Sequence, residues 1–269
     1  GARSFAAARQ AAVQALCPGS DVAALLDKPN NNLAVEYCKA IIEQNVEMQP
    51  IALPRQGADH GQALTESSHT AFASASALRA LWAEGGAAAL APYVPEKALK
   101  LYKQAEYDGK YTDFAVMGHC ELALLRAACA GQAPFAAVRG VSEGLEHRLE
   151  NAVRETASLP ALLDALTTVR YPRARMRRLA MDAALGYTAQ TPALPPYLHL
   201  LGARKEALSL PGETALPLSH SLARLARENE TCAQMAAAQS RASDLGALCR
   251  TKPEPMGGIY RQKIIFLTN

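Results

Sequence analysis

Five arginines fall within nine residues of the chain, and no acidic residue interrupts them. They are Arg170, Arg173, Arg175, Arg177 and Arg178. Pro172 suits the first turn of a helix, because its missing N–H would have no partner there, so we expect a helix from Pro172 to about Tyr187. Arginines three or four residues apart then lie one turn apart, near the positive end of the helix dipole. This spacing predicts a cationic ridge that suits the phosphates of a polyanion, since the planar guanidinium pairs with phosphate through two hydrogen bonds.

The same arginines also fit a plainer interpretation, a solvated helix face that pairs with acidic residues elsewhere in the chain. The formal net charge of the 269 residues is only +3, so a nucleic-acid surface would have to come from local clustering. The segment from Arg170 to Arg178 supplies such a cluster, and the sequence leaves both interpretations open.

A second group of residues, nearer the start of the chain, suits the binding of a nucleotide. In chain order they are Asn30, Asn31, Arg55, Ser74, Ser76 and Arg79. The two asparagines stand at an expected helix start, where backbone N–H groups are free, and the first arginine ends an expected strand, a usual place for a ligand contact. The two serines open another helix, with the second arginine one turn on, and these groups can hold anionic oxygens. Each residue taken alone also fits a helix cap or a surface position.

The elements that must position these residues change in character along the chain. Apolar spacing and helix caps predict helices over residues 3–16, 22–26, 29–43 and 73–82. Residues 48–55 are apolar with prolines at their edges and predict a short strand, and residues 56–70 predict a mobile loop. Helix, strand, loop and helix in this order indicate part of an α/β domain.

From residue 93 onward, helical patterns dominate. They cover residues 95–104, 114–130, 142–157, 160–168, 172–187 and 222–249. Residues 197–202 fit either a strand or the lead-in to a helix, and residues 258–267 have the isoleucine and aromatic content of a strand. The sequence therefore predicts a mainly α protein, with residues 1–92 as the C-terminal part of an α/β, Rossmann-type nucleotide-binding domain and residues 93–269 as an all-helical or mostly helical domain.

Composition and missing motifs exclude several classes of protein. No two of the six cysteines have the spacing of a zinc knuckle, so we expect reduced thiols, no disulfide framework and no metal site. We find no signal peptide and no apolar run of about 18 residues, which predicts a cytoplasmic protein without a membrane span. Nucleophile elbow, Walker loop and zinc-protease motifs are missing. Glu146 or His147 could serve as a catalytic base, but helical spacing from Arg154 also explains Glu146 and Glu150 as surface partners.

Several segments, in order, resemble motifs of the tRNA(Met) cytidine acetate ligases, a nucleotidyltransferase-like family. The segment PNNNLAVEY at residues 29–37 resembles the family's PNNxLxxEY motif, and SASALR at residues 74–79 resembles its SATxIR-like stretch. Arg55 lies between them at the family's spacing. The resemblance continues through residues 142–148, 170–175 and 196–202, and it covers most of residues 1 to about 205.

The resemblance implies an enzyme that uses ATP, with Mg²⁺, to activate acetate as acetyl-adenylate and then acetylates N4 of the wobble cytidine of elongator tRNA(Met). It implies ATP contacts from Asn30 and Arg55, with Asn31 a neighbour that the motif does not separate from Asn30. By analogy with related nucleotidyltransferases, the phosphates would be held by Ser74, Ser76 and Arg79. From their charge, we infer that the arginines of residues 170–178 face tRNA phosphates, within a tRNA-binding lobe over residues 93–269.

The sequence also departs from the family pattern. The family's HxGH-type motif and the first strands of its nucleotide-binding sheet belong before Gly1 and are absent, and the chain opens without methionine. We therefore expect an N-terminally truncated chain whose catalytic residues are missing and which is inactive alone. Two other functions stay open: a nucleotidyltransferase that acts on a small molecule, and a non-catalytic helical module that binds RNA or protein.

Overall fold

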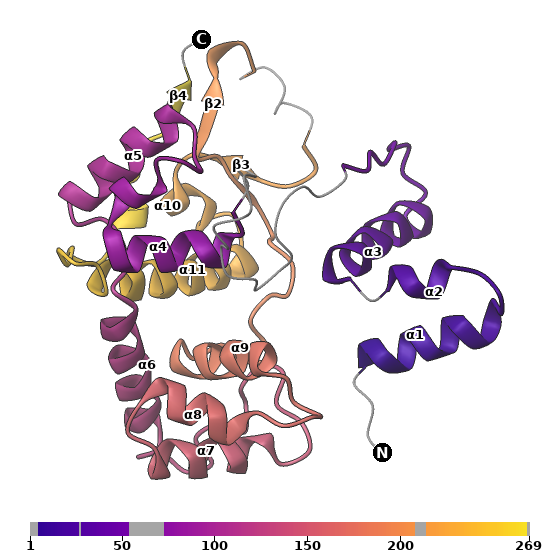
Figure 1. Ribbon diagram of the computed structural model, residues 1–269. Coiled ribbons are helices and arrows are strands. Elements are labelled where there is room, and N and C mark those ends of the chain that lie inside the picture. Colours follow the sequence, from indigo (N-terminus) through magenta and orange to yellow (C-terminus); the bar gives the residue numbers. More distant parts are fainter. Residues whose placement is uncertain (1–4, 27, 54–72, 208–213, 268–269) are drawn as a thin grey trace. The chain divides into compact units, whose positions relative to one another are not determined.

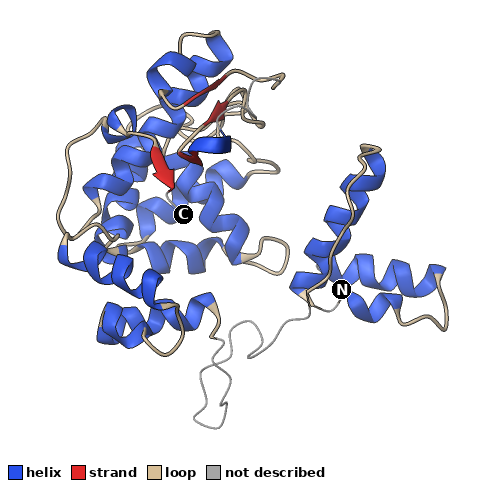
Figure 2. Cartoon of the chain, turned by 90° about the horizontal axis from the view of Figure 1, so that it is seen from above, coloured by secondary structure: helices blue, strands red, loops and turns tan. Residues whose placement is uncertain are grey.

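Helices dominate the computed structural model, which describes residues 5–26, 28–53, 73–207 and 214–267 (Figures 1 and 2). The chain divides into two compact units. The first unit comprises residues 1–95 with 168–170, and the second comprises residues 96–167 with 171–269. No helix among the described residues is both long enough and apolar enough to cross a lipid bilayer.

The described part of the first unit is helical. Its elements are α1 (Phe5–Leu16), α2 (Val22–Leu25), α3 (Pro29–Glu43), α4 (Ala75–Gly85) and the 3-10 turn η1 (Ala87–Leu90). Helix α1 packs on α2, and α4 packs on η1. The strand expected over residues 48–55 is wrong over residues 48–53, which follow α3 without pairing into a sheet. Pro50 cannot donate a backbone hydrogen bond, which disfavours pairing there. Residues 54–72, including Arg55 and the expected loop, lie outside the described residues.

The second unit contains most of the helices. They are α5 (Glu96–Tyr107), α6 (Phe114–Ala128), α7 (Leu145–Glu155), α8 (Leu159–Leu166), α9 (Arg173–Ala184), α10 (Leu222–Leu225), α11 (Glu230–Leu248) and the 3-10 helix η3 (Gly258–Arg261). Several of these helices have an N-cap side chain that accepts a hydrogen bond from the first turn. Asp113 Oδ1 accepts from the Ala115 N–H at 2.8 Å, and Asn229 Oδ1 accepts from the Cys232 N–H at 2.9 Å. Such caps satisfy donors that a helix start leaves free.

The main hydrophobic core lies where α6, α7, α8 and α9 meet at one end of the second unit (Figure 1). Its largest fully buried side chains are Leu125, Phe135, Leu145, Leu149, Val153, Leu162, Leu166 and Met176. Burying a side chain of this size stabilises the fold by about 1.5–3 kcal/mol. A second, smaller core packs Tyr197 against α10 and α11.

Among the described residues, four short strands correct the expectation of an all-helical second part (Figure 2). They are β1 (Leu198–His199), β2 (Gly202–Arg204), β3 (Leu218–Ser219) and β4 (Ile265–Leu267). Strands β1 and β3 pair in parallel, and so do β2 and β4. The tail expected as one strand over residues 258–267 forms η3 first, and the helix expected over residues 222–249 breaks before Asn229, whose side chain starts α11 anew.

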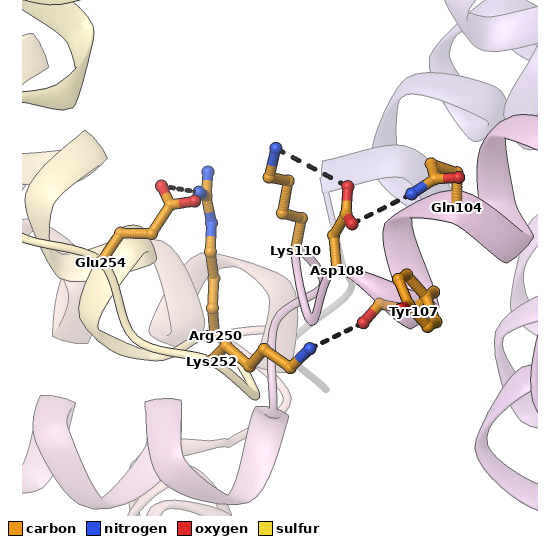
Figure 3. A network of polar contacts seen from close by, with 7 residues as sticks. All are labelled: Gln104, Tyr107, Asp108, Lys110, Arg250, Lys252 and Glu254. Atoms are coloured by element: carbon orange, nitrogen blue, oxygen red, sulfur yellow. Dashed lines mark hydrogen bonds and ion pairs between the residues drawn. The ribbon is translucent and has the colours of Figure 1, made fainter.

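A polar connection ties the end of α5 to the segment after α11 (Figure 3). Lys252 Nζ donates to the Tyr107 carbonyl at 2.8 Å and lies 5.5 Å from the centre of the Tyr107 ring. The Lys252 N–H donates to the carbonyl of Gly109, which adopts a φ of +67°. A Cβ at Gly109 would lie 2.5 Å from Lys252 Cγ, so this turn needs glycine for both its backbone and the closeness of the lysine.

Candidate functional site

Helix α9 carries the arginine segment, and its position follows from the alternation of apolar and basic residues. Met176, Leu179 and Ala180 are buried in the core shared with α6, α7 and α8, which turns the opposite face toward solvent. Pro172 lies one position earlier than expected: it precedes the first turn in an extended conformation, and its carbonyl accepts from the Met176 N–H at 3.2 Å. The helix ends at Ala184 rather than at Tyr187, because Gly186 adopts a φ of +67° and closes the last turn.

The structure places four of the five expected arginines on α9, and Arg170 lies exposed just before it in sequence. Arg173 forms an ion pair with Asp164 at the end of α8. The guanidinium of Arg175 lies 5.1 Å from the centre of the Tyr171 ring, within the range of a cation–π contact. Arg178 is exposed and has no ion-pair or hydrogen-bond partner for its side chain among the described residues. The ridge is therefore partly paired and partly available to an anion.

A buried carboxyl group lies near the ridge. Glu121 on α6 is only 3% exposed, and α6 packs directly on α9. Burial raises the pKa of Glu121 from 4.5 to about 7, while the nearby Arg177 cation lowers it. Near neutral pH, the Glu121 carboxyl is therefore protonated in part of the molecules.

The segment before α7 forms the edge of a pocket of about 460 Å³. Glu143 and Gly144 take consecutive left-handed conformations, with φ of 56° and 79°, which turn the chain sharply into the helix. The Tyr171 hydroxyl donates to Glu143 Oε2 at 3.2 Å. Arg148 Nη2 donates to the Ala165 carbonyl at 2.7 Å, so it closes the far side of the pocket against α8.

The two residues considered as a catalytic base have ordinary surface surroundings. His147 is exposed, and its Nε2 lies 3.8 Å from Glu146 Oε1. The surface pairing expected for Arg154 is confirmed with Glu150, at 2.7 Å, and Arg154 also donates to the Cys129 carbonyl.

The asparagines expected to contact ATP lie within the first turn of α3, rather than capping it. Lys28 is the N-cap, Pro29 follows as the first helical residue, and Asn30 and Asn31 come next. The amide of Asn32 reaches back to the Leu26 carbonyl at 2.6 Å and so fixes the helix start. The side chains of Asn30 and Asn31 have no hydrogen-bond partner among the described residues, which leaves both amides available to a ligand.

The serines expected to hold phosphate lie together at the start of α4. Ser74 is buried, its Oγ accepts from the Ala77 N–H at 3.2 Å, and it lies 3.0 Å from Ser76 Oγ. The cap interpretation therefore holds for Ser74. Ser76 and Arg79 are exposed, and no described residue pairs with the Arg79 side chain.

The structure brings the two serines together at the start of α4. Arg55, which follows α3 and precedes α4 in the sequence, lies outside the described residues. An apolar groove of about 630 Å³ runs along α3, lined by residues 34–52 such as Tyr37, Ile41 and Met48, and it includes neither Asn30 nor Asn31.

Sequence reasoning missed several residues around α9, although helical spacing contains their signal. Arg148, Asn151 and Glu155 follow one face of α7 and line the same pocket. Tyr171 and Arg175 are four residues apart and meet as ring and cation. Glu121 lies on α6 beside the buried Leu122 and Leu125, and these apolar neighbours in the sequence indicate that Glu121 is buried too. Within the described ranges, no three His, Cys, Asp or Glu side chains are grouped so as to hold a metal ion.

Comparisons with known proteins place this geometry in a family. The family described as HIGH Nucleotidyl Transferase matches residues 2–257. A protein named tRNA(Met) cytidine acetate ligase from Listeria monocytogenes serotype 4b (strain CLIP80459) is 30% identical over 183 residues, which are 67% of this chain and 45% of that protein. One of the same name from Geobacillus sp. (strain WCH70) is 29% identical over 185 residues, 66% of this chain and 45% of that protein. The chain thus spans less than half the length of these relatives, whose names confirm the resemblance carried by the motifs.

Solved structures show the same fold. The crystal structure of Thermotoga maritima TmcAL (apo, form I) aligns with a TM-score of 0.83 at 20% sequence identity, over 99% of this chain and 68% of that one. A second crystal structure of T. maritima TmcAL, bound with alpha-thio ATP, aligns with a TM-score of 0.82 at 20% identity, over 98% of this chain and 67% of that one. At this level of identity, the likeness shows the nucleotidyltransferase-like fold.

Proposed function

Since the chain belongs to the HIGH nucleotidyl transferase family, we propose that it serves the ATP-dependent acetylation of N4 of the wobble cytidine in elongator tRNA(Met). The relatives named tRNA(Met) cytidine acetate ligase support this proposal, and the alpha-thio ATP bound to T. maritima TmcAL supports ATP as the nucleotide. The observation in this chain that carries it is the exposed arginine face of α9.

In the proposed reaction, an acetate oxygen attacks the α-phosphate of ATP, and pyrophosphate leaves. The amino nitrogen of cytidine then attacks the acetyl carbonyl, AMP leaves, and the amine gives up a proton. Both steps place negative charge on phosphate oxygens, which fixed donors and cations stabilise. Mg²⁺ usually reaches such a site on the phosphates themselves, held by few protein ligands.

We assign nucleotide contacts to the first unit. Asn30 and Asn31 offer side-chain amides at a helix start, and Ser76 and Arg79 offer a hydroxyl and a cation on α4; neither amide nor the Arg79 cation has a partner in the part of the chain that the structure describes. Ser74 supports them by capping α4, and Arg55 keeps its expected role in ATP binding.

We assign tRNA contacts to the second unit. Cations on one rigid helix suit a polyanion, because each neutralised phosphate releases counterions. The availability of the arginines differs along the ridge: Arg178 has no side-chain partner among the described residues, while Arg173 pairs with Asp164. Arg175 and Arg177 complete the proposed surface of this unit, and Arg170, which belongs to the first unit, is proposed as a further tRNA contact. A protein with these substrates would work in the cytoplasm, where tRNA and ATP occur.

Deleting the reading frame that encodes the chain tests the proposal directly. Elongator tRNA(Met) from the deleted strain should lack N4-acetylcytidine at the wobble position, as measured by mass spectrometry of nuclease digests. Reintroducing the reading frame should restore the modified nucleoside, and reintroducing it with Arg178→Glu should restore less. Unchanged N4-acetylcytidine in the deleted strain would contradict the proposal.

A further inference from the structure

The pocket in front of α7 has a chemistry different from that of the arginine ridge beside it. Buried Leu145 and Ala152 line it together with polar side chains. Those polar side chains are Glu143, Arg148, Asn151, Glu155 and Tyr171. A volume of about 460 Å³ falls within the usual range for pockets that hold small ligands or parts of larger ones.

Two of the polar side chains that line the pocket bind no other described residue. Asn151 and Glu155 lie one turn apart on α7, both exposed, and neither side chain has a hydrogen-bond or ion-pair partner among the described residues. The Arg148 guanidinium, by contrast, already donates to the Ala165 carbonyl. The available groups are therefore a carboxylate, which only accepts hydrogen bonds, and an amide, which both donates and accepts.

Charge separates the pocket from the ridge. Glu143 and Arg148 are both engaged, Glu143 by the Tyr171 hydroxyl and Arg148 by the Ala165 carbonyl, whereas the Glu155 carboxylate is available. The available carboxylate disfavours a phosphate group in the pocket, whereas the exposed cations of α9 attract it. Tyr171 joins the two places, because it lines the pocket while Arg175 stacks on its ring at 5.1 Å.

We propose that this pocket binds one unpaired nucleobase that carries an exocyclic amino group, while the neighbouring phosphates lie on the arginine face of α9. The proposal rests on the proposed function, since it assumes that α9 contacts RNA. Carboxylates accept hydrogen bonds from the amino group of cytosine, and proteins read single-stranded RNA by holding unstacked bases against aromatic rings and guanidinium planes. Uracil presents a carbonyl where cytosine presents the amine. The Glu155 carboxylate and this carbonyl both only accept hydrogen bonds, so they cannot pair.

Two labelled pentanucleotides, oligocytidine and oligouridine, differ in this group and test the proposal. Their dissociation constants from the full chain are measured by fluorescence anisotropy at low salt. We expect the cytidine oligomer to bind about tenfold more tightly than the uridine oligomer. Glu155→Gln replaces the carboxylate with an amide that also donates, so it should bring the two affinities together, and Asn151→Ala should reduce the preference.

A matched control and a second variant separate the possible failures. Glu228→Gln makes the same change at an exposed residue that has no side-chain partner among the described residues and lies outside this pocket, and it should keep the full preference. Arg178→Glu should weaken both oligomers equally, because it acts on phosphates. Equal binding of the two oligomers to the unaltered chain, or a preference that survives Glu155→Gln, would overturn the pocket proposal but leave RNA binding by α9 intact. Failure of both oligomers and of tRNA to bind would overturn the role of α9 as well.

Discussion

Helices α9 and α3 differ in what their apolar faces contact. Met176 and Ala180 of α9 are fully buried against α6, α7 and α8. On α3, Leu33, Tyr37 and Ile42 remain 54–78% exposed. An amphipathic pattern predicts a helix in both cases, but only packing fixes which way its polar face points. Packing therefore fixes the direction of the arginines on α9, whereas the apolar side chains of α3 remain exposed beside Asn30 and Asn31.

Truncating one apolar side chain on each helix gives the largest expected difference between α9 and α3. Met176→Ala removes a fully buried side chain and should lower the free energy of unfolding by about 2–5 kcal/mol through lost burial and a cavity. Ile42→Ala, at a side chain 78% exposed, should change it by less than about 0.5 kcal/mol. Urea denaturation of both variants measures the difference. Similar losses at the two sites would show that α3 is as closely packed as α9.

Measuring stability as a function of pH would sharpen the comparison, because a buried carboxyl group, Glu121, lies on α6, which packs against α9. Between about pH 4.5 and pH 7, folded Glu121 keeps a proton that the unfolded chain has released, so stability falls as pH rises through this window. The total change is at most about 3 kcal/mol. Glu121→Gln should flatten this dependence in urea denaturation across the window, and Arg177→Gln, which removes the cation that lowers the pKa, should extend it to higher pH. A wild-type curve that rises over the same window would contradict the assignment.

Charge reversal at an arginine of α9 tests whether the exposed arginine face binds tRNA. Arg178→Glu should weaken tRNA binding about tenfold and reduce the salt dependence, because one phosphate contact is lost and a repulsion appears. Arg227→Glu changes the net charge equally at another exposed arginine without a described partner, and it serves as the control. If both variants weakened binding alike, general charge rather than the α9 surface would explain it.

The smallest expected effect concerns the polar connection between α5 and the segment after α11. Gly109→Ala places a side chain in a left-handed conformation and against Lys252, which should cost about 1–2 kcal/mol in thermal or urea unfolding. Gly131→Ala meets only an ordinary contact at 3.6 Å, so its effect should be close to zero. A neutral Gly109→Ala would show that the lysine moves aside without loss.

Much of the fold could be predicted because local signals agreed with packing. Helices were expected to begin at residues 29 and 114 and do begin there, and the apolar spacing around Met176 indicated the buried face of α9. The strand expected after α3 failed over its described part because apolar residues between prolines carry no information about a pairing partner. The strand expected over residues 258–267 is confirmed for β4, but its pairing with β2 could not be predicted, since that pairing joins residues far apart in sequence.

In the candidate site too, some features could be predicted from the sequence and others could not. The exposure of Arg178 followed from helical periodicity, and so did the position of Asn30 in a first helical turn. The ion pair of Arg173 with Asp164 and the closeness of Arg177 to Glu121 depend on how separate helices pack. Spacing within one helix does not contain that information.

The parallel pairing of β2 with β4 has a consequence for how the protein is made. Gly202 pairs with Ile265, and the Cβ of any other residue at position 202 would lie 3.1 Å from the Ile265 carbonyl oxygen. Residues 202–204 therefore cannot find their partner until residues 265–267 have left the ribosome. During synthesis, α9 and the helices that pack on it can fold first, and β4 then pairs with β2.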